Sequence, residues 1–273
     1  MIRYLLLVMF AAPLTASAVV IRHDVEDAKY RIPASVFPAL ADLPGEGQGV
    51  LIAPHWVVTA AHAVPSQGLD DVTIGGVARK VERVVAHPGY KRLPEALGKQ
   101  AVASGDASEV MAFLANVDDI ALVRLAAPVA DVAPVVLYRQ SDEIGRTVTL
   151  IGKGATGTGI EGQGLHAYHR TELRRAFNVV TGADVRWLSY TFDAPPAGLP
   201  LEGITGSGDS GGPVLVDADG GQQLAGLASW NKYAQSSVRP FHAGLYGQVV
   251  YSVRISRYAG WIDGVMSAGS AGD

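Results

Sequence analysis

The sequence predicts an all-β protein that ends in a helix. Short runs of β-forming residues recur along the chain, and Gly, Pro, Asn and Asp separate them. There are 32 glycines, while aromatic residues make up only 7% of the chain, which is typical of many tight turns. Runs this short and frequent indicate a sandwich or a barrel. Strands do not alternate with long helical segments, so a doubly wound α/β sheet is disfavoured.

The clearest predicted strands are residues 49–53, 56–59, 81–85, 120–125, 147–151, 213–216, 223–228 and 249–253. Two segments depart from this pattern. Residues 94–114 are rich in alanine, have helix-compatible apolar spacing and look like an insertion between strands. Residues 257–266 repeat apolar side chains at i, i+3, i+4 and i+7, which predicts a C-terminal helix. The small and polar tail, residues 267–273, is expected to fray.

Composition limits the classes of function. The chain has 273 residues, 48% of them apolar and 18% charged, which suits a globular protein with a core. Its net charge of −4, with both signs interspersed, argues against nucleic acid or an anionic membrane surface as partner. Because the chain contains no cysteine, disulfides, thiol chemistry and thiolate metal sites are excluded.

The first residues predict a secretory signal peptide. Arg3 gives a basic start, residues 4–14 are mostly apolar, and Ala16-Ser17-Ala18 is a small-x-small cleavage site. A membrane anchor is the alternative, but the apolar run is shorter than the roughly 20 residues needed to span a bilayer. We therefore expect residues 1–18 to be removed and residues 19–273 to be secreted or periplasmic, with no membrane span.

Ser210 lies in the segment with the clearest chemical meaning, Gly206-Ser207-Gly208-Asp209-Ser210-Gly211-Gly212. Glycines allow close backbone approach and positive φ, so successive N–H groups can point into one cavity and stabilise an oxyanion. Taken alone, the segment could equally be a surface turn. A serine hydroxyl needs a base before it becomes a nucleophile.

His62 is the candidate base, because it directly follows the apolar strand 56–59 and can face a cleft while the core holds its backbone. The six other histidines lie in more polar or turn-like settings. Asp119 is the candidate acid that orients His62, since it opens the apolar run 120–123. Asp118 is its rival and would point to the opposite face of a strand that starts there.

The segments 59–62, 119–122 and 208–213 resemble the three signature segments of the chymotrypsin/trypsin-like serine proteases, in the order His, Asp, Ser. Ser229-Trp230, Gly152-Lys153-Gly154 and residues 251–262 resemble further parts of that family. The resemblance covers about residues 19–262. It implies two six-stranded antiparallel β-barrels, about residues 19–135 and 136–262, with the active site between them.

The resemblance also implies roles for single residues. His62, Asp119 and Ser210 would form the catalytic triad of a monomeric endopeptidase that cuts proteins or peptides without a metal or cofactor. Gly208 and Ser210 would supply the oxyanion N–H groups. Asp209 would pair with a freed N-terminal amine, and cleavage after Ala18 would release Val19 at about the right place.

The substrate-binding residues would be Ile204, Thr205, Ser229, Trp230 and Asn231. Ile204 stands where an acid would have predicted cleavage after Lys or Arg, although Glu202 is near enough that a shifted loop would change this. The family's disulfides are all missing, and Asn231 replaces a glycine.

Two other classes of function stay open. The segment Gly208–Gly212 also fits the G-x-S-x-G nucleophile elbow of α/β-hydrolases, but that motif needs a helix after the serine, and residues 213–216 read as a strand. An esterase of that fold would also take its acid and histidine from Asp217 or Asp219 and His242. The second alternative is an inactive, protease-like binding protein, which usually lacks a triad residue, and none is lacking here.

Overall fold

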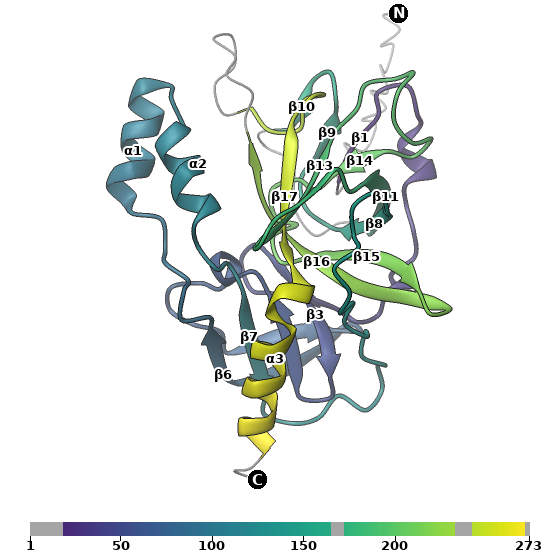
Figure 1. Cartoon of the computed structure of the whole chain (residues 1–273). Helices are drawn as coiled ribbons and strands as arrows, with labels where there is room; N and C mark the ends of the chain where they lie inside the picture. The colour runs from purple at the N-terminus through teal and green to yellow at the C-terminus, as the bar shows by residue number, and fades with distance from the viewer. Residues whose placement is uncertain (1–18, 165–171, 233–241, 271–273) are drawn as a thin grey trace, which may run out of the picture.

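A computed structural model describes residues 19–164, 172–232 and 242–270 (Figure 1). The predicted signal peptide, residues 1–18, lies outside these ranges. Strands are the most common regular elements of the described chain, two helices stand to one side, and a longer helix ends it (Figure 1). The predicted fold class, an all-β protein with a barrel and a C-terminal helix, is confirmed.

Within the described residues, six strands close an antiparallel barrel in the order β2-β3-β4-β7-β6-β5. Their bounds are β2 Leu40–Asp42, β3 Gln48–Ala53, β4 Trp56–Thr59, β5 Asp71–Ile74, β6 Val77–Ala86 and β7 Ala121–Leu125. Every residue of β4 and β7 is buried, which explains the continuous apolar runs there. These two strands pair with each other, so that the end of β4, just before His62, lies beside the start of β7, just after Asp119.

The second half is an open sheet rather than the expected closed barrel of six strands. In the described ranges it has seven strands in the order β11-β8-β15-β16-β17-β13-β12. Their bounds are β8 Thr147–Gly152, β11 Arg174–Val179, β12 Gly182–Ala183, β13 Trp187–Thr191, β15 Pro213–Ala218, β16 Gly221–Lys232 and β17 Val249–Arg254. A bridge between Phe177 and Glu202 links the edge strand β11 to a smaller sheet, which extends this half further.

The smaller sheet brings the beginning of the described chain into the second half. Its order is β10-β9-β1-β14, with bounds β1 Val19–Ile21, β9 Thr156–Thr158, β10 Gly162–Gln163 and β14 Gly203–Ile204. Strand β1 pairs in parallel with β9 and antiparallel with β14. The first strand therefore belongs with the second half, although the sequence had suggested a first barrel from residue 19. The boundary near residue 135 stays a prediction.

Helices form where the apolar spacing predicted them. The insertion contains two, α1 Glu95–Ser104 and α2 Ser108–Ala115, which stand side by side away from the barrel (Figure 1). Helix α3 spans Ile255–Ser270, so it begins earlier than predicted and continues through most of the segment expected to fray. Its residues Ile255, Tyr258 and Ile262 pack in one core with barrel residues such as Trp56, and this burial stabilises the helix.

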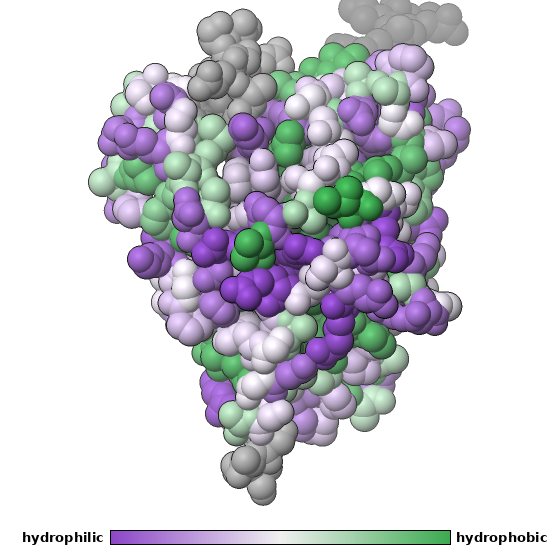
Figure 2. Space-filling model, in the orientation of Figure 1, coloured by the Kyte–Doolittle hydropathy of each residue, from purple (hydrophilic) through white to green (hydrophobic). Residues whose placement is uncertain are grey.

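The surface shown in Figure 2 gives no sign of a large apolar patch. Hydrophilic residues form a broad band across the middle of that face, and hydrophobic residues are scattered around it. Of the helices described, none has the length and apolar character needed to cross a membrane.

Glu143 fixes the start of α3 through a buried ion pair. Its fully buried carboxylate accepts hydrogen bonds from Arg254 Nε at 2.9 Å, Arg254 Nη2 at 2.7 Å and Ser256 Oγ at 2.7 Å. Burial alone would raise the pKa of Glu143, but Arg254 and Ser256 outweigh it and the pKa is lowered.

We predict that Glu143→Ala lowers the free energy of unfolding by about 3 kcal/mol, because it leaves Arg254 without its buried partner. Urea unfolding measures this. Asp263→Ala, which removes the exposed pair with Arg139, is the control and should cost less than about 1 kcal/mol. Because the pKa of Glu143 is lowered by folding, its contribution should fade as the pH falls below about 4. Equal losses of unfolding free energy in Glu143→Ala and Asp263→Ala would contradict the stabilising role of the buried pair.

Candidate active site

Ser210 lies on a turn of the second half that is attached to the barrel. Its carbonyl accepts the N–H of Gln48, on β3, at 2.7 Å. Gly211 follows with φ +78°, and a Cβ there would lie 2.2 Å from the Gln48 carbonyl oxygen and 2.3 Å from Thr59 Oγ1. The glycine after Ser210 is therefore required, since any side chain would push the two halves apart.

His62 lies in the short 3-10 turn η3, Ala61–Ala63, directly after β4. Its Nε2 is 2.8 Å from Ser210 Oγ, and its Nδ1 is 2.6 Å from Asp119 Oδ2. The carboxylate can only accept, so Nδ1 carries the proton. Nε2 is then free to accept the Ser210 hydroxyl proton, as a general base must.

Asp119 lies just before β7 and is buried, and it faces His62. Besides Nδ1, its oxygens accept the His62 backbone N–H at 2.8 Å and Ser229 Oγ at 2.6 Å. The rival Asp118 faces the other way. It accepts Arg186 Nε at 3.0 Å and Tyr258 Oη at 2.8 Å. The structure therefore brings Asp119, and not Asp118, to His62 and Ser210.

The electrostatics of the pair suit a base that becomes charged. Burial lowers the pKa of His62, but the charge and the hydrogen bond of Asp119 outweigh it, so the pKa is raised. For Asp119, burial acts in the opposite direction and would raise the pKa. The charge and hydrogen bond of His62, with the hydrogen bond of Ser229, outweigh burial, so the pKa of Asp119 is lowered. An imidazolium at position 62 is thus stabilised by a carboxylate that stays ionised.

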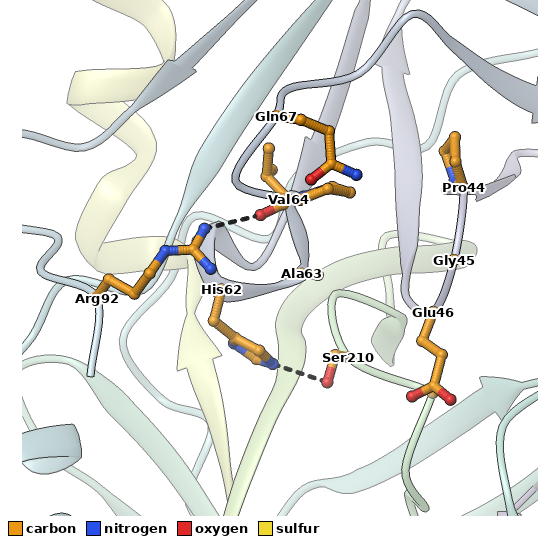
Figure 3. A pocket seen from close by; sticks show the side chains of 11 residues that line it. Pro44, Gly45, Glu46, His62, Ala63, Val64, Gln67, Arg92 and Ser210 are labelled. Atoms are coloured by element: carbon orange, nitrogen blue, oxygen red, sulfur yellow. Dashed lines mark hydrogen bonds between the residues drawn. The ribbon is translucent and has the colours of Figure 1, made fainter. Parts of the chain in front are cut away.

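The backbone around Ser210 offers two unoccupied donors. Among the described residues, neither the N–H of Gly208 nor that of Ser210 has an acceptor. Both residues line a cavity of about 410 Å³ together with His62. Figure 3 shows Arg92 and Glu46 on opposite sides of the His62–Ser210 pair in this cavity. Two free N–H groups beside a nucleophile can bind an oxyanion.

Asp209 is fully buried and points away from His62. Its Oδ1 accepts Gly154 N–H at 2.6 Å and Gln48 Nε2 at 3.1 Å, and its Oδ2 accepts Gly206 N–H at 2.9 Å. In the described ranges no basic side chain forms an ion pair with it. Burial raises the pKa of Asp209 despite these hydrogen bonds. A buried carboxylate that lacks a cation is a position where a positive charge would bind well.

Four of the five predicted substrate-binding residues line one cavity of about 230 Å³ next to Ser210: Thr205, Ser229, Trp230 and Asn231. The fifth, Ile204, does not. It is fully buried on β14, paired with Val20 in the core of the second half. The carboxylate of Glu202 is also absent from this lining, because it accepts the N–H groups of Asp193 and Leu199 at 2.7 and 2.5 Å.

Sequence reasoning missed several residues of the cleft. Leu114 of α2 lines the cavity beside Ser210 and a second one of about 200 Å³ beside His62 and Asp119. Val110 of α2 lines the first of these. The helical spacing of residues 94–114 was a signal for the insertion, but nothing in it showed which face would meet the cleft. Gln48, which contacts Asp209, carried no signal, since it lies one residue before the predicted strand 49–53 and the structure extends β3 to include it.

The alternative of a nucleophile elbow fails on local structure. An elbow needs a strand before the serine and a helix after it. Here β15 begins at Pro213, so a strand follows Ser210. The acids proposed for that alternative, Asp217 and Asp219, lie at the far end of β15 and in the turn after it.

Comparisons with known proteins agree with this arrangement. A family model described as Trypsin matches residues 29–262. A trypsin of Saccharopolyspora erythraea is 32% identical over 220 residues, covering 74% of this chain and 81% of the relative. A trypsin of Phaedon cochleariae is 27% identical over 239 residues, covering 79% of this chain and 76% of the relative. Among solved structures, neuropsin, a serine protease of mouse brain, has a TM-score of 0.62 and 22% identity, covering 87% of this chain and 99% of its own. At that identity, the last likeness concerns the fold.

We predict that Asp119→Asn lowers the pKa of His62 below its ordinary value of about 6.5, because burial then acts without the compensating carboxylate. An NMR titration of the imidazole measures this directly. Asp118→Asn is the matched control and should leave the titration of His62 unchanged, since Asp118 does not contact it. A pKa of His62 that responds to Asp118→Asn instead would show that the wrong acid has been assigned.

Proposed function

Because this chain belongs to the trypsin family and is a serine-type endopeptidase, we propose that His62, Asp119 and Ser210 are the triad with which it cuts peptide bonds. The observation that carries this proposal is the continuous set of hydrogen bonds from Ser210 Oγ through both nitrogens of His62 to Asp119. The two free N–H groups of Gly208 and Ser210 support it, since an acyl transfer needs an oxyanion site beside its nucleophile.

In the proposed mechanism, Ser210 Oγ attacks the scissile carbonyl carbon while His62 Nε2 takes its proton. The carbonyl oxygen becomes negative and accepts the N–H groups of Gly208 and Ser210. Asp119 stays ionised and stabilises the imidazolium. His62 then gives the proton to the leaving amine, and an acyl-enzyme on Ser210 remains. Water, activated by the same imidazole, hydrolyses that ester and regenerates the serine.

The cavity beside Ser210 bears on which bond is cut. The residues that line it in the described part of the chain include Thr205, Ala228, Asn231 and Ala243. None of these lining residues has a charged side chain. We propose that the cavity accepts an uncharged side chain from the residue before the scissile bond, because a buried Lys or Arg would find no carboxylate among the lining residues that the structure describes. The support for this proposal comes from the cavity lining and not from Ile204, which lies in the core.

We also propose that residues 1–18 are a signal peptide, that the protein is exported to the periplasm or beyond the cell, and that signal removal frees the amine of Val19 to pair with Asp209. Val19 is fully buried, and it pairs with Thr156, close in sequence to Gly154, which binds Asp209. Val19 also has φ +66°, which is strained for a β-branched residue. Cleavage after Ala18 would remove that restraint and supply the missing cation.

We predict that Ser210→Ala or His62→Ala lowers kcat by about 10⁶-fold and Asp119→Asn by about 10⁴-fold. Turnover of a peptide library measures these losses, and it also reports the accepted side chain. Asp118→Asn is the control and should stay within about tenfold of the wild type. Labelling of Ser210 by a fluorophosphonate would separate an enzyme from a binding protein. A wild type that labels but cleaves only esters would contradict the proposal.

We predict that the exported enzyme begins at Val19 and that Asp209→Asn lowers kcat/KM by about 10²–10³-fold, the loss expected when an oxyanion donor is removed. N-terminal sequencing and kinetics measure the two parts. Asp217→Asn, at an exposed position on β15, is the control and should be neutral. A mature start well after Ile21, with full activity, would refute the role given to Val19.

A further inference from the structure

We propose that Gln163 is a positioning residue for the oxyanion site: its side-chain amide holds Ser207 and so aims the Gly208 N–H into the cleft. The inference rests on the proposed function, in which that N–H receives the substrate oxyanion. Gln163 lies on β10, in a part of the chain that contributes neither to the triad nor to the cavities described above.

One amide binds Ser207 at two points. Gln163 Oε1 accepts the Ser207 N–H at 3.0 Å, and Gln163 Nε2 donates to Ser207 Oγ at 2.8 Å. Ser207 is exposed, so water competes for each bond and either one alone would be weak. Because a single planar group makes both, ordering that one side chain secures the backbone and the side chain of Ser207 together.

The next peptide plane explains why Ser207 matters. The Ser207 carbonyl accepts the Ala155 N–H at 2.6 Å. In a trans peptide the C=O and the following N–H point in opposite directions, so this bond turns the Gly208 N–H away from Ala155. Gly208 has φ +88° and can rotate at little steric cost. Ser207 is thus held on both sides, by Ala155 after it and by Gln163 before it, and both contacts help to keep the direction of this plane.

Gln163 itself is firmly placed. Its backbone N–H donates to the Ala243 carbonyl at 2.8 Å, and β10 pairs with β9. That pairing is unusually close, because a Cβ on Gly157 would lie 1.8 Å from the Gly162 carbonyl oxygen. A backbone packed this tightly fixes the position of the Gln163 Cα, from which the side-chain amide reaches Ser207. Strand β9 in turn pairs with β1, so the strand that begins at Val19 supports the same hairpin.

The test uses Gln163→Met, which keeps the length of the side chain and removes both hydrogen bonds. We expect kcat to fall about tenfold, less than the 10²–10³-fold loss of a whole oxyanion donor, with KM within twofold of the wild type. Affinity for a peptide aldehyde, which forms a tetrahedral adduct with Ser210, should fall by the same factor as kcat. The NMR titration of His62 should not change.

Gln223→Met is the matched control, because Gln223 is partly exposed and its amide hydrogen-bonds only to Asp219, at 3.1 Å, among the described residues. Unchanged kcat and aldehyde affinity in Gln163→Met would overturn the inference. So would a change in KM and in the His62 titration alongside kcat, which would indicate a general structural loss.

Amide hydrogen exchange gives a readout that needs no activity. In the Ser210→Ala protein, Gln163→Met should speed exchange of the Ser207 N–H about tenfold, and Gln223→Met should not. A wild type that cleaves no peptide would refute the proposed function, and exchange would still decide the positioning role. An unchanged exchange rate would overturn it.

Discussion

The hydrogen bond from the Gln48 N–H to the Ser210 carbonyl joins the two halves of the molecule where their alignment matters. His62 and Asp119 are placed by the barrel strands β4 and β7, whereas Ser210 precedes β15 of the open sheet. A misplacement of about 1 Å between such groups can cost about 10²-fold in rate. Gly211 enforces the same contact sterically, because its missing Cβ lets the turn touch β3 and β4.

The chain achieves this alignment without a disulfide, through buried polar contacts. The Asp209 carboxylate accepts hydrogen bonds from the N–H groups of Gly154 and Gly206, and so connects the loops next to the turn that carries Ser210. On the barrel side, Gly47 and Ala63 pack so closely that a Cβ on Gly47 would lie 3.0 Å from the Ala63 Cβ. A disulfide acts largely by restricting the unfolded chain, whereas these contacts act only in the folded state. The loops around the site therefore depend on contacts of the folded state, such as those of Asp209.

Particular residues show how far the sequence could predict this arrangement. The strand 56–59 was predicted with the bounds of β4, because complete burial leaves an unbroken apolar run. The sequence alone did not show which of the two adjacent aspartates, Asp118 or Asp119, faces His62. Asp118 and Asp119 diverge through the turn before β7, where the Ile120 N–H bonds to the Asp118 carbonyl. Ile204 was assigned by counting back from Ser210, and only the pairing of β14 with β1 shows that it belongs to the core.

The helical insertion adds lining residues to the cleft without changing the position of Asp119. The chain leaves the barrel near His87 and returns at Asp118, and the Asp118 N–H bonds to the Gly89 carbonyl at 3.3 Å, which closes the base of the insertion. At the C-terminal end of α2, Trp187 Nε1 donates to the Ala115 carbonyl at 3.0 Å and fixes α2 against the open sheet. Once the ends of a loop are joined, extra length costs little free energy. Helix α2 can thus bring Leu114 to the cleft without any change in the barrel strands that orient His62.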